Sequence, residues 1–545
     1  MKRLKIVLHC KWFYCGLLCL SLIFSLLEIN KPLTSVYSED DTIFIGTIVS
    51  VKKSSEIVSI KIKAEESLRG TYYLDNKESF SYNVGDVVKI IGTLEKGSHN
   101  TIPNLFDYAD YLRSKGESWV LQIDYIEKIG ESKNIINILK RSIINKIDTY
   151  KSKDYLKVFL IGDQSELDTE IVSSYRENGI SHLFSISGMH LSFLSGILIF
   201  IMSKVRGISN VSYLITCVLL VFYMFLVGCS ASVVRACIFF IFRYIYSLLR
   251  IKVPIQYIFL LMISIVLFIK PSFILDVGFQ YSISISYFLL IKSSNGSKNY
   301  FLSMLEVSIL SFFVSLPISL YYFYQVNFLG IIYNLIFVPS VSLIIFPLSF
   351  ITFFFPFFDT IFYFLTNIME SLSIILAKIS YGKVIFMKPM VWWIVLYYLF
   401  LILQCKKKYI RFFLIMLIIL LYFYPKIVTF KEVMMIDVGQ GDSILVESQG
   451  KSLLIDTGGK FYKYSNNSIT ATKLLPLFKS KGIRKLNYLV LTHGDFDHMG
   501  EAINLVENFK VEKVIFNCGG FNELEQELIK ILVQKKIPYY SCIKE

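Results

Sequence analysis

A short run near the C-terminal end of the chain holds the residues best suited to metal chemistry. The sequence LTHGDFDHMG places His493, Asp495, Asp497 and His498 directly after an apolar stretch. Imidazole nitrogens and carboxylate oxygens are ligands for Zn²⁺ and Mn²⁺, and one turn can aim several of them at one point. A metal bound there lowers the pKa of a water molecule and supplies hydroxide for hydrolysis. The pattern predicts a divalent metal site with Asp497 as the candidate catalytic residue; the alternative is a charged surface turn.

Two preceding segments must position this loop if it is to work as a site. EVMMIDVGQGDSILVES and KSLLIDTGG each join an apolar strand to a glycine-containing turn, and LNYLVL supplies the strand before the candidate ligands. The residues alternate and turn as strand–turn–strand blocks do. We therefore expect one domain over residues 428–545.

A second group of polar residues lies inside long apolar runs. Ionisable side chains at membrane depth are costly and usually face a protein interior or a wet cavity. The candidates for such a polar passage are His182, His190, Arg235, Asp276, Gln280 and Asn334. Pro339 interrupts one of these runs, and broken helices are tolerated in membranes where they line a passage. The alternative for Arg235 is an anchor at the membrane interface.

The first of these runs, SHLFSISGMHLSFLSG, is rich in small residues. On an ideal helix, one narrow stripe is formed by Ser181, Ser185, Gly188, Ser192 and Ser195. Small residues let helix backbones approach closely in lipid, so the stripe predicts a tight helix–helix contact. The two histidines of the run favour a polar cavity instead.

The composition is that of a membrane protein. Of the 545 residues, 54% are hydrophobic and 18% are charged. Stretches such as 210–228, 253–270 and 389–404 carry almost no charge and approach the roughly 20 residues that a spanning helix needs. We predict a polytopic α-helical membrane protein with eight to ten membrane segments over 181–425, which excludes a simple soluble enzyme.

The formal net charge is +14, and nearly all of the excess lies between residues 131 and 427. One explanation is that Lys and Arg flank the spans on the cytoplasmic side. The other is a basic lining for a polyanion such as nucleic acid.

Polarity divides the chain into five parts. They are a membrane anchor (1–30), a mixed domain (40–130), a polar, interfacial helical stretch (131–180), a multi-span domain (181–425) and a C-terminal domain (428–545). Basic residues before the anchor place the N-terminus inside. The basic loop formed by Lys406, Lys407, Lys408 and Arg411 would lie inside as well. Both soluble domains are then expected outside the cell.

Residues 41–63 alternate between apolar and polar side chains, as half-buried strands do. Short strands across residues 40–130 predict a small β-barrel of the OB type. Such barrels often bind single-stranded nucleic acid through basic grooves and stacking aromatic residues. Because this segment is net negative, a structural or partner-docking role is the alternative.

Several motifs, taken in order, resemble those of ComEC-type competence proteins, the DNA-uptake channels of naturally transformable bacteria. These motifs are HLFSISGMHLSFLSG, SASVVRA, GFQYSISISYF and NLIFVPSVS. VGDVVKIIGTL and NLFDYADYLRSKG are similar to the extracellular OB-like domain of that family. The C-terminal loop resembles the start of an αββα metallo-β-lactamase-type domain, so the resemblance covers nearly the whole chain.

The resemblance implies transport of single-stranded DNA across the bacterial cytoplasmic membrane during natural transformation. It also implies other competence proteins as partners, namely a DNA receptor and an ATP-dependent translocase, and further copies of the chain. In that family the C-terminal domain is proposed to degrade the strand that is not imported.

The chain departs from this family in its C-terminal domain. No histidine follows His498 and no aspartate follows Asp497. The full fold needs later histidine ligands and a bridging carboxylate. We therefore expect an incomplete domain, from a truncated or interrupted gene or from a separately encoded second half, and no hydrolysis by this chain alone.

Three other functions stay open on the sequence. The chain could be a membrane-anchored metal-dependent nuclease or hydrolase whose spans serve mainly as an anchor. It could be a small-molecule transporter, since intramembrane polar residues do not identify the cargo, although no inverted repeat is visible. A non-functional relic is the third possibility.

Overall fold

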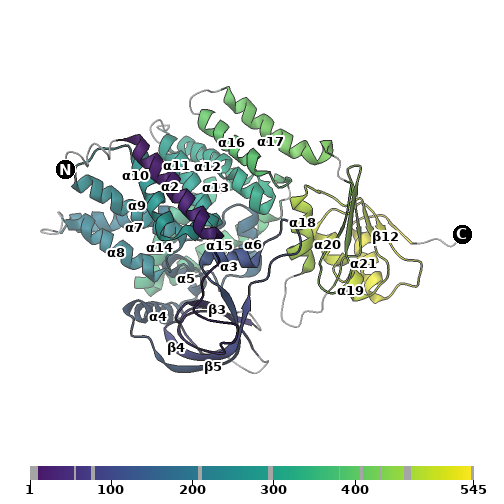
Figure 1. Ribbon diagram of the computed structural model, residues 1–545, viewed down its shortest axis with the longest axis horizontal. Coiled ribbons are helices and arrows are strands. Elements are labelled where there is room, and N and C mark those ends of the chain that lie inside the picture. Colours follow the sequence, from purple (N-terminus) through teal and green to yellow (C-terminus); the bar gives the residue numbers. More distant parts are fainter. Residues whose placement is uncertain are drawn as a thin grey trace. The chain divides into compact units, whose positions relative to one another are not determined.

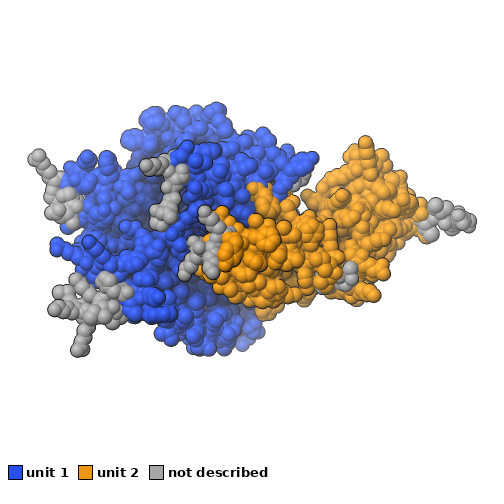
Figure 2. Space-filling view, turned by 90° about the horizontal axis from the view of Figure 1, so that it is seen from above, with its two compact units in different colours: residues 1–98, 108–315, 329–382 blue, residues 99–107, 316–328, 383–545 orange. Residues whose placement is uncertain are grey.

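The computed structural model describes residues 10–53, 57–74, 80–205, 211–292, 299–379, 381–404, 409–428, 431–459 and 468–541. Lys406, Lys407 and Lys408 of the basic loop lie outside these ranges. The chain divides into two compact units (Figure 2). Unit 1 contains residues 1–98, 108–315 and 329–382, and unit 2 contains residues 99–107, 316–328 and 383–545. Both units thus combine segments that are distant in the sequence.

Unit 1 begins with helix α2 (Lys11–Asn30), which is followed by five strands. The strands are β1 (Ile43–Lys53), β2 (Ile57–Lys63), β3 (Ser67–Tyr73), β4 (Asp86–Lys96) and β5 (Trp119–Glu131). They pair in the order β1-β2-β3-β5-β4, and the pairing of β1 with β4 closes the ring (Figure 1). All pairs are antiparallel except β3 with β5. Alternate side chains, among them Phe44, Ile60 and Val88, fill the interior, as the two-residue period of a strand requires.

A buried carboxylate ties three segments of this ring together. Glu117 follows helix α3 (Tyr108–Lys115) and is 1% exposed. It accepts hydrogen bonds from Nζ of Lys61 at 2.7 Å and from Nε of Arg69 at 3.1 Å. Burial by itself raises the pKa of Glu117, but the hydrogen bonds and charges of Lys61 and Arg69 outweigh it and hold the pKa below its ordinary value. Glu117 therefore stays ionised and joins β2, β3 and the segment before β5.

The segment after the ring is helical. It forms α4 (Ile135–Ile147), α5 (Lys153–Ile161) and α6 (Thr169–Glu177). The Asn134 side chain caps α4 by accepting from the Ile136 N–H at 2.9 Å. Every residue from Tyr155 to Ile161 is buried, and Phe159 packs in one core with Phe346 of a later helix. Helix α5 is thus part of the core of unit 1.

Seven helices in the described part of the chain are long and apolar enough to cross a membrane. They are α2; η1 (Ser181–Leu183) with α7 (Gly188–Ser203); α9 (Ala231–Leu248); α12 (Tyr300–Phe323); α13 (Gly330–Pro339) with the π-helical η5 (Ser340–Ile345) and α14 (Phe346–Phe354); η6 (Pro356–Phe358) with α15 (Asp359–Ala377); and α17 (Ile410–Ile427). Shorter apolar helices are α8 (Ser212–Leu226), α10 (Ile255–Ile269) and α16 (Val391–Gln404). Between α10 and α12 lie η3 (Pro271–Leu275) and α11 (Val277–Lys292). The chain is a multi-pass membrane protein.

The prediction of one continuous helix through residues 181–196 is wrong. The η1 turn ends at Leu183, and α7 begins only at Gly188, because Ser187 is extended with φ −119° and ψ 172°. The stripe of small residues is therefore not continuous: Ser192 is exposed and bonds the Gly188 carbonyl of its own helix, whereas Ser195 is buried.

Unit 2 is built on a six-stranded sheet of order β13-β12-β11-β10-β9-β8. Its strands are β8 (Glu432–Met435), β9 (Ile444–Ser448), β10 (Lys451–Ile455), β11 (Tyr488–Val490), β12 (Val514–Ile515) and β13 (Tyr539–Tyr540). The pairs β8–β9 and β9–β10 are antiparallel, and those from β10 to β13 are parallel. The helical segments are η7 (Thr470–Leu474), α18 (Leu475–Ser480), α19 (Phe496–Met499), α20 (Ala502–Asn508) and α21 (Glu523–Gln534). Leu454, Leu489 and Leu528 are fully buried in the core that the sheet and helices share.

The last span belongs to unit 2 and is held to its sheet domain by Arg484. Its Nη2 donates to the Tyr422 carbonyl of α17 at 2.8 Å, and its guanidinium lies 3.7 Å from the centre of the Tyr422 ring. Its Nε donates to the Ile385 carbonyl at 3.1 Å, in a short strand β7 (Lys383–Ile385) that pairs with β6 (Gln325–Asn327). One cation thus joins three segments of unit 2.

Glu117→Gln is expected to destabilise the five-stranded ring at pH 7 by about 2 kcal/mol, because Lys61 and Arg69 lose their shared charged acceptor. Amide hydrogen exchange of the β1–β5 peptides in the full chain measures this. Glu127→Gln, an exposed site on β5, is the control and should change stability by less than about 0.5 kcal/mol.

The sign of the pH dependence follows from the lowered pKa of Glu117. Its contribution is present above the ordinary carboxyl pKa of about 4.3 and is lost as the pH falls through the lower folded value. The difference between the native chain and Glu117→Gln should shrink in acid. Equal exchange of the two proteins at pH 7 would contradict this role.

Candidate functional site

In unit 2, the predicted metal-binding loop lies next to two other turns, the one between β8 and β9 and the one after β10. It follows β11, and Asp495 is the N-cap residue of the short helix α19, which contains Asp497 and His498. The turn between β8 and β9 and the turn after β10 contact the backbone of α19 through glycines. A Cβ on Gly441 would lie 1.7 Å from the Asp497 carbonyl oxygen, and one on Gly459 would lie 1.9 Å from that of Phe496. Only residues without a side chain allow these turns to approach so closely.

Asp456, which the sequence analysis did not single out, organises the loop. It directly follows β10 and is 2% exposed. Its carboxylate accepts hydrogen bonds from the Thr492 N–H at 2.9 Å and the Thr492 hydroxyl at 2.6 Å. It also lies 3.1 Å from Nδ1 of His498. A carboxylate behind a histidine fixes the ring orientation and directs the free Nε2 outward, as in many metal-binding histidines.

The two histidines lie side by side, each with a carboxylate next to it. Their ring centroids are 3.8 Å apart. Nε2 of His493 lies 3.5 Å from Asp495, and Nε2 of His498 lies 3.7 Å from Asp497. Nevertheless, among the described residues no group of three His, Cys, Asp or Glu side chains is arranged to hold a metal ion. The described residues thus do not form a complete metal site, and we derive no hydrolytic step from them.

A second carboxylate of unit 2 is fixed by a segment from far earlier in the chain. Asp437 accepts a hydrogen bond from the Thr101 hydroxyl at 2.6 Å and one from the Gly439 N–H at 3.1 Å. The Thr101 hydrogen bond and the positive charge of Lys473 lower the pKa of Asp437. Ile102, the next residue along, is 4% exposed in the core of unit 2. Segment 99–107 is therefore part of this domain, and no local sequence pattern predicts this association.

The two histidines of the candidate passage have different surroundings. His182, in η1, is exposed, whereas His190 is 2% exposed. Nδ1 of His190 accepts from the Ser187 N–H at 3.2 Å, and the ring stacks on Phe346 with 4.4 Å between centroids. Its Nε2 is buried and has no hydrogen-bond partner among the described residues. Because Nδ1 accepts a hydrogen bond, Nε2 carries the proton of the neutral ring.

Asp276 and Gln280 both hold the beginning of α11. Asp276 accepts from the Phe279 N–H at 2.9 Å and pairs with Nζ of Lys115 at 2.6 Å. Nε2 of Gln280 donates to the Ile274 carbonyl at 2.9 Å. Asp276 is therefore a helix cap that also ties α11 to α3, through an ion pair between residues 161 positions apart.

Arg235 and Asn334 each carry a buried atom without a partner in the described part of the chain. Arg235 lies in α9, is 7% exposed, and leaves its Nε unsatisfied. Asn334 lies in α13 and leaves its Oδ1 unsatisfied. Whether the six predicted residues share one passage stays a prediction.

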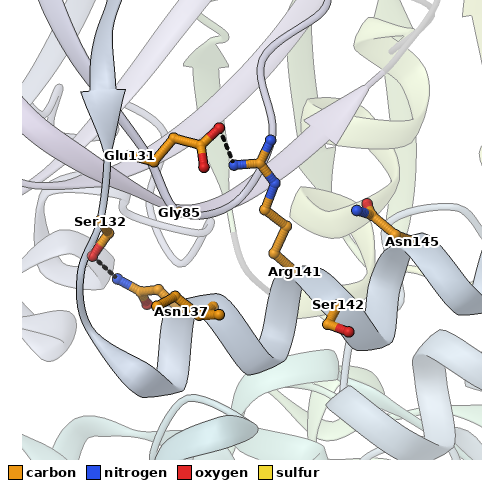
Figure 3. A pocket seen from close by; sticks show the side chains of 8 residues that line it. Gly85, Glu131, Ser132, Asn137, Arg141, Ser142 and Asn145 are labelled. Atoms are coloured by element: carbon orange, nitrogen blue, oxygen red, sulfur yellow. Dashed lines mark hydrogen bonds and ion pairs between the residues drawn. The ribbon is translucent and has the colours of Figure 1, made fainter.

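A pocket of about 250 Å³ lies between the five-stranded ring and α4 (Figure 3). It is lined by Gly85, Glu131, Ser132, Asn137, Ile138, Arg141, Ser142 and Asn145. Arg141 pairs with Glu131 at 2.9 Å, and Nδ2 of Asn137 donates to the Ser132 hydroxyl at 3.0 Å. Arg141 and Glu131, the two charged side chains of the pocket, thus pair with each other. These contacts hold α4 against the ring.

Gly441→Ala is expected to destabilise unit 2 by about 3 kcal/mol, because the new Cβ overlaps the Asp497 carbonyl and the residue has φ +90°. Gly439→Ala is the matched control: its φ is +91°, but a Cβ there meets nothing within 4 Å. This control should cost about 1 kcal/mol. Chemical unfolding of the two variants, monitored by proteolysis of the C-terminal domain, compares their stabilities. Equal losses of stability would contradict the close approach of Gly441 to Asp497.

Comparison with known proteins agrees with this arrangement. Residues 159–411 match the model of the Competence protein family, and residues 436–539 match that of the Metallo-beta-lactamase superfamily. ComE operon protein 3 of Bacillus subtilis is 26% identical over 89% of this chain and 68% of its own length. An uncharacterized protein of Mycoplasma pneumoniae is 29% identical over 37% of this chain and 53% of its own length. Competence protein ComA of Neisseria gonorrhoeae is 36% identical over 14% of this chain and 10% of its own length. The chain therefore matches the Competence protein model in its spanning part and the metallo-β-lactamase superfamily model in its C-terminal part, and it is similar to ComE operon protein 3 over most of its length.

Proposed function

We propose that this protein carries one strand of DNA across the cell membrane during natural transformation. The observation that carries the proposal is the match of the Competence protein model to residues 159–411, which contain most of the candidate spans. The similarity to ComE operon protein 3 along 89% of the chain adds to it. Small-molecule transport has no comparable support.

We assign the path of the strand to the polar groups of the spans. The strongest candidates are buried groups without partners among the described residues, on His190, Arg235 and Asn334. His182 is exposed just before α7, while Asp276 and Gln280 shape the start of α11. Water and a polyanion can satisfy groups that hydrocarbon cannot.

We also infer that the five-stranded ring is of the OB type and lies outside the cell with the C-terminal domain. Five strands closed in the order β1-β2-β3-β5-β4 fit that type. The basic residues before α2 favour an N-terminus inside the cell, which puts the ring outside. Its net negative charge favours docking of a partner, such as a DNA receptor, over DNA binding. An ATP-dependent translocase and further copies of the chain are the other partners we propose.

A metal-dependent nuclease is the second candidate function, with Zn²⁺ or Mn²⁺ as the metal. The hydrogen bond between Asp456 and His498 favours it, because it orients a histidine as metal sites do. The lack of three suitably placed ligands among the described residues opposes it.

Deletion of the gene in a transformable host should reduce nuclease-protected uptake of labelled DNA to background while DNA still binds the cell surface. The reason is that no other passage for the strand remains. Complementation with the native chain is the control. Uptake that continues unchanged after a clean deletion would rule out the proposed function.

Purified full-length protein is expected to cut single-stranded DNA no faster with added Mn²⁺ or Zn²⁺ than the Asp497→Ala variant does, because the described ligand set is incomplete. Gel analysis of labelled DNA measures this, and calorimetric titration with ZnCl₂ measures metal binding separately. Metal-dependent cleavage that disappears in Asp497→Ala would favour the nuclease instead.

A further inference from the structure

The guanidinium of Arg235 is a buried cation without a counter-charge in the described part of the chain. The residue lies little more than one turn into α9 and is 7% exposed. Its Nε is buried and has no hydrogen-bond partner among the described residues. An arginine carries its charge at all physiological pH values. A buried charge is costly unless it is paired and hydrogen-bonded, so this position calls for an acceptor.

The same guanidinium lies over the N-terminus of another spanning helix. Its Nη2 is 2.8 Å, and its Cζ 3.8 Å, from the point that a Cβ on Gly188 would occupy. Gly188 is the first residue of α7, a helix of 16 residues. The N–H groups of a first helical turn lack intrahelical acceptors, and the helix dipole makes that end positive.

Neighbouring contacts hold the two parts together. The Ser232 hydroxyl of α9 donates to the Ile186 carbonyl at 2.9 Å, just before α7 begins. Ala236 of α9 would lie 3.6 Å from a Cβ on Gly188. Because α9 is fixed against the segment before α7, the cation and the helix N-terminus stay adjacent. Two features that each attract anions are thus brought to one place.

We propose that Arg235 and the N-terminus of α7 together bind a backbone phosphate of the DNA strand in transit. The inference rests on the proposed function and assigns its first phosphate contact. A guanidinium offers a planar fork of donors that matches phosphate oxygens, and helix N-termini bind phosphates through backbone N–H groups. Contacts of this kind ignore base sequence, as passage of any DNA requires. Gly188 leaves room for the guanidinium to lie at the helix end.

Binding of a short fluorescein-labelled oligothymidine to the full chain in phosphatidylcholine nanodiscs tests the proposal. Arg235→Gln is expected to weaken binding about tenfold, the loss of one charged hydrogen-bonded contact. The slope of log affinity against log salt should fall by about 0.7, the value for one phosphate of a single strand. Gly188→Ala should weaken binding as well, because its Cβ displaces Nη2, and Arg235→Lys should recover only part of the affinity. Arg243→Gln, an exposed arginine of the same helix, is the matched control and should bind like the native chain.

Two further measurements separate a phosphate contact from a structural role. An oligothymidine with an uncharged methylphosphonate backbone should bind the native chain and Arg235→Gln equally. Thermal unfolding without DNA should not occur at a lower temperature in Arg235→Gln, since an unpaired buried charge is removed. A clear loss of stability in that variant would show that the guanidinium supports the fold and would overturn the proposal.

The remaining outcomes are also decisive. Equal binding of oligothymidine by the native chain and Arg235→Gln, while the native chain supports DNA uptake, would overturn only the phosphate site. An effect of Arg235→Gln that appears only with phosphatidylglycerol in the nanodiscs would assign the site to a lipid headgroup and overturn it too. A native chain that neither binds oligothymidine nor restores uptake would overturn the proposed function itself.

Discussion

Hydrocarbon supplies no hydrogen-bond partners, and this constraint governs the spanning part of the molecule. Most hydroxyl side chains of the spans meet it within their own helix. Ser192, Ser340 and Ser342 each donate to the carbonyl four residues earlier. The many serines of the sequence therefore do not mark a passage by themselves. The informative groups are those that stay unsatisfied among the described residues, such as Nε2 of His190 and Nε of Arg235.

The lack of hydrogen-bond partners in hydrocarbon also bears on the break in the helix before α7. Ending η1 at Leu183 and restarting the helix at Gly188 places a helix N-terminus within a candidate span. Ser187 and His190 form a capping box there, and hydrocarbon supplies no acceptor for the other N–H groups of the first turn. The nearby guanidinium of Arg235 makes the place more positive. An anion that moves through this place, such as a DNA backbone, would satisfy both features. A strand held through its phosphates could then pass irrespective of its bases.

In unit 2, carboxylates hold the loops of the described structure. Asp456 fixes Thr492 and His498, and Glu501 accepts from the N–H groups of Ile469 and Thr470. The contact of Asp456 with His498 helps to hold the two histidine rings next to each other. The loop thus holds its two histidines as a metal-binding loop would, and whether it binds a metal depends on the remaining ligands.

The sequence by itself determined those features that depend on local pattern. Apolar length predicted the spanning helices, period-two alternation predicted the strands of the ring, and HGDFDH predicted a loop with its side chains close together. The order of short motifs indicated the resemblance to ComEC-type competence proteins. Each of these signals lies within one segment, where propensity and periodicity act directly.

Only the tertiary structure decided which of those residues meet. Asp276 caps α11 and pairs with Lys115, because the chain brings α3 to that helix end, while its place in the passage stays a prediction. Asp456 and Thr101 were missed because their partners lie 42 and 336 residues away in the sequence. The stripe of small residues is not continuous because the chain breaks at Ser187, which a helical wheel cannot show. Contacts between distant segments depend on packing of the whole chain, and no local pattern encodes them.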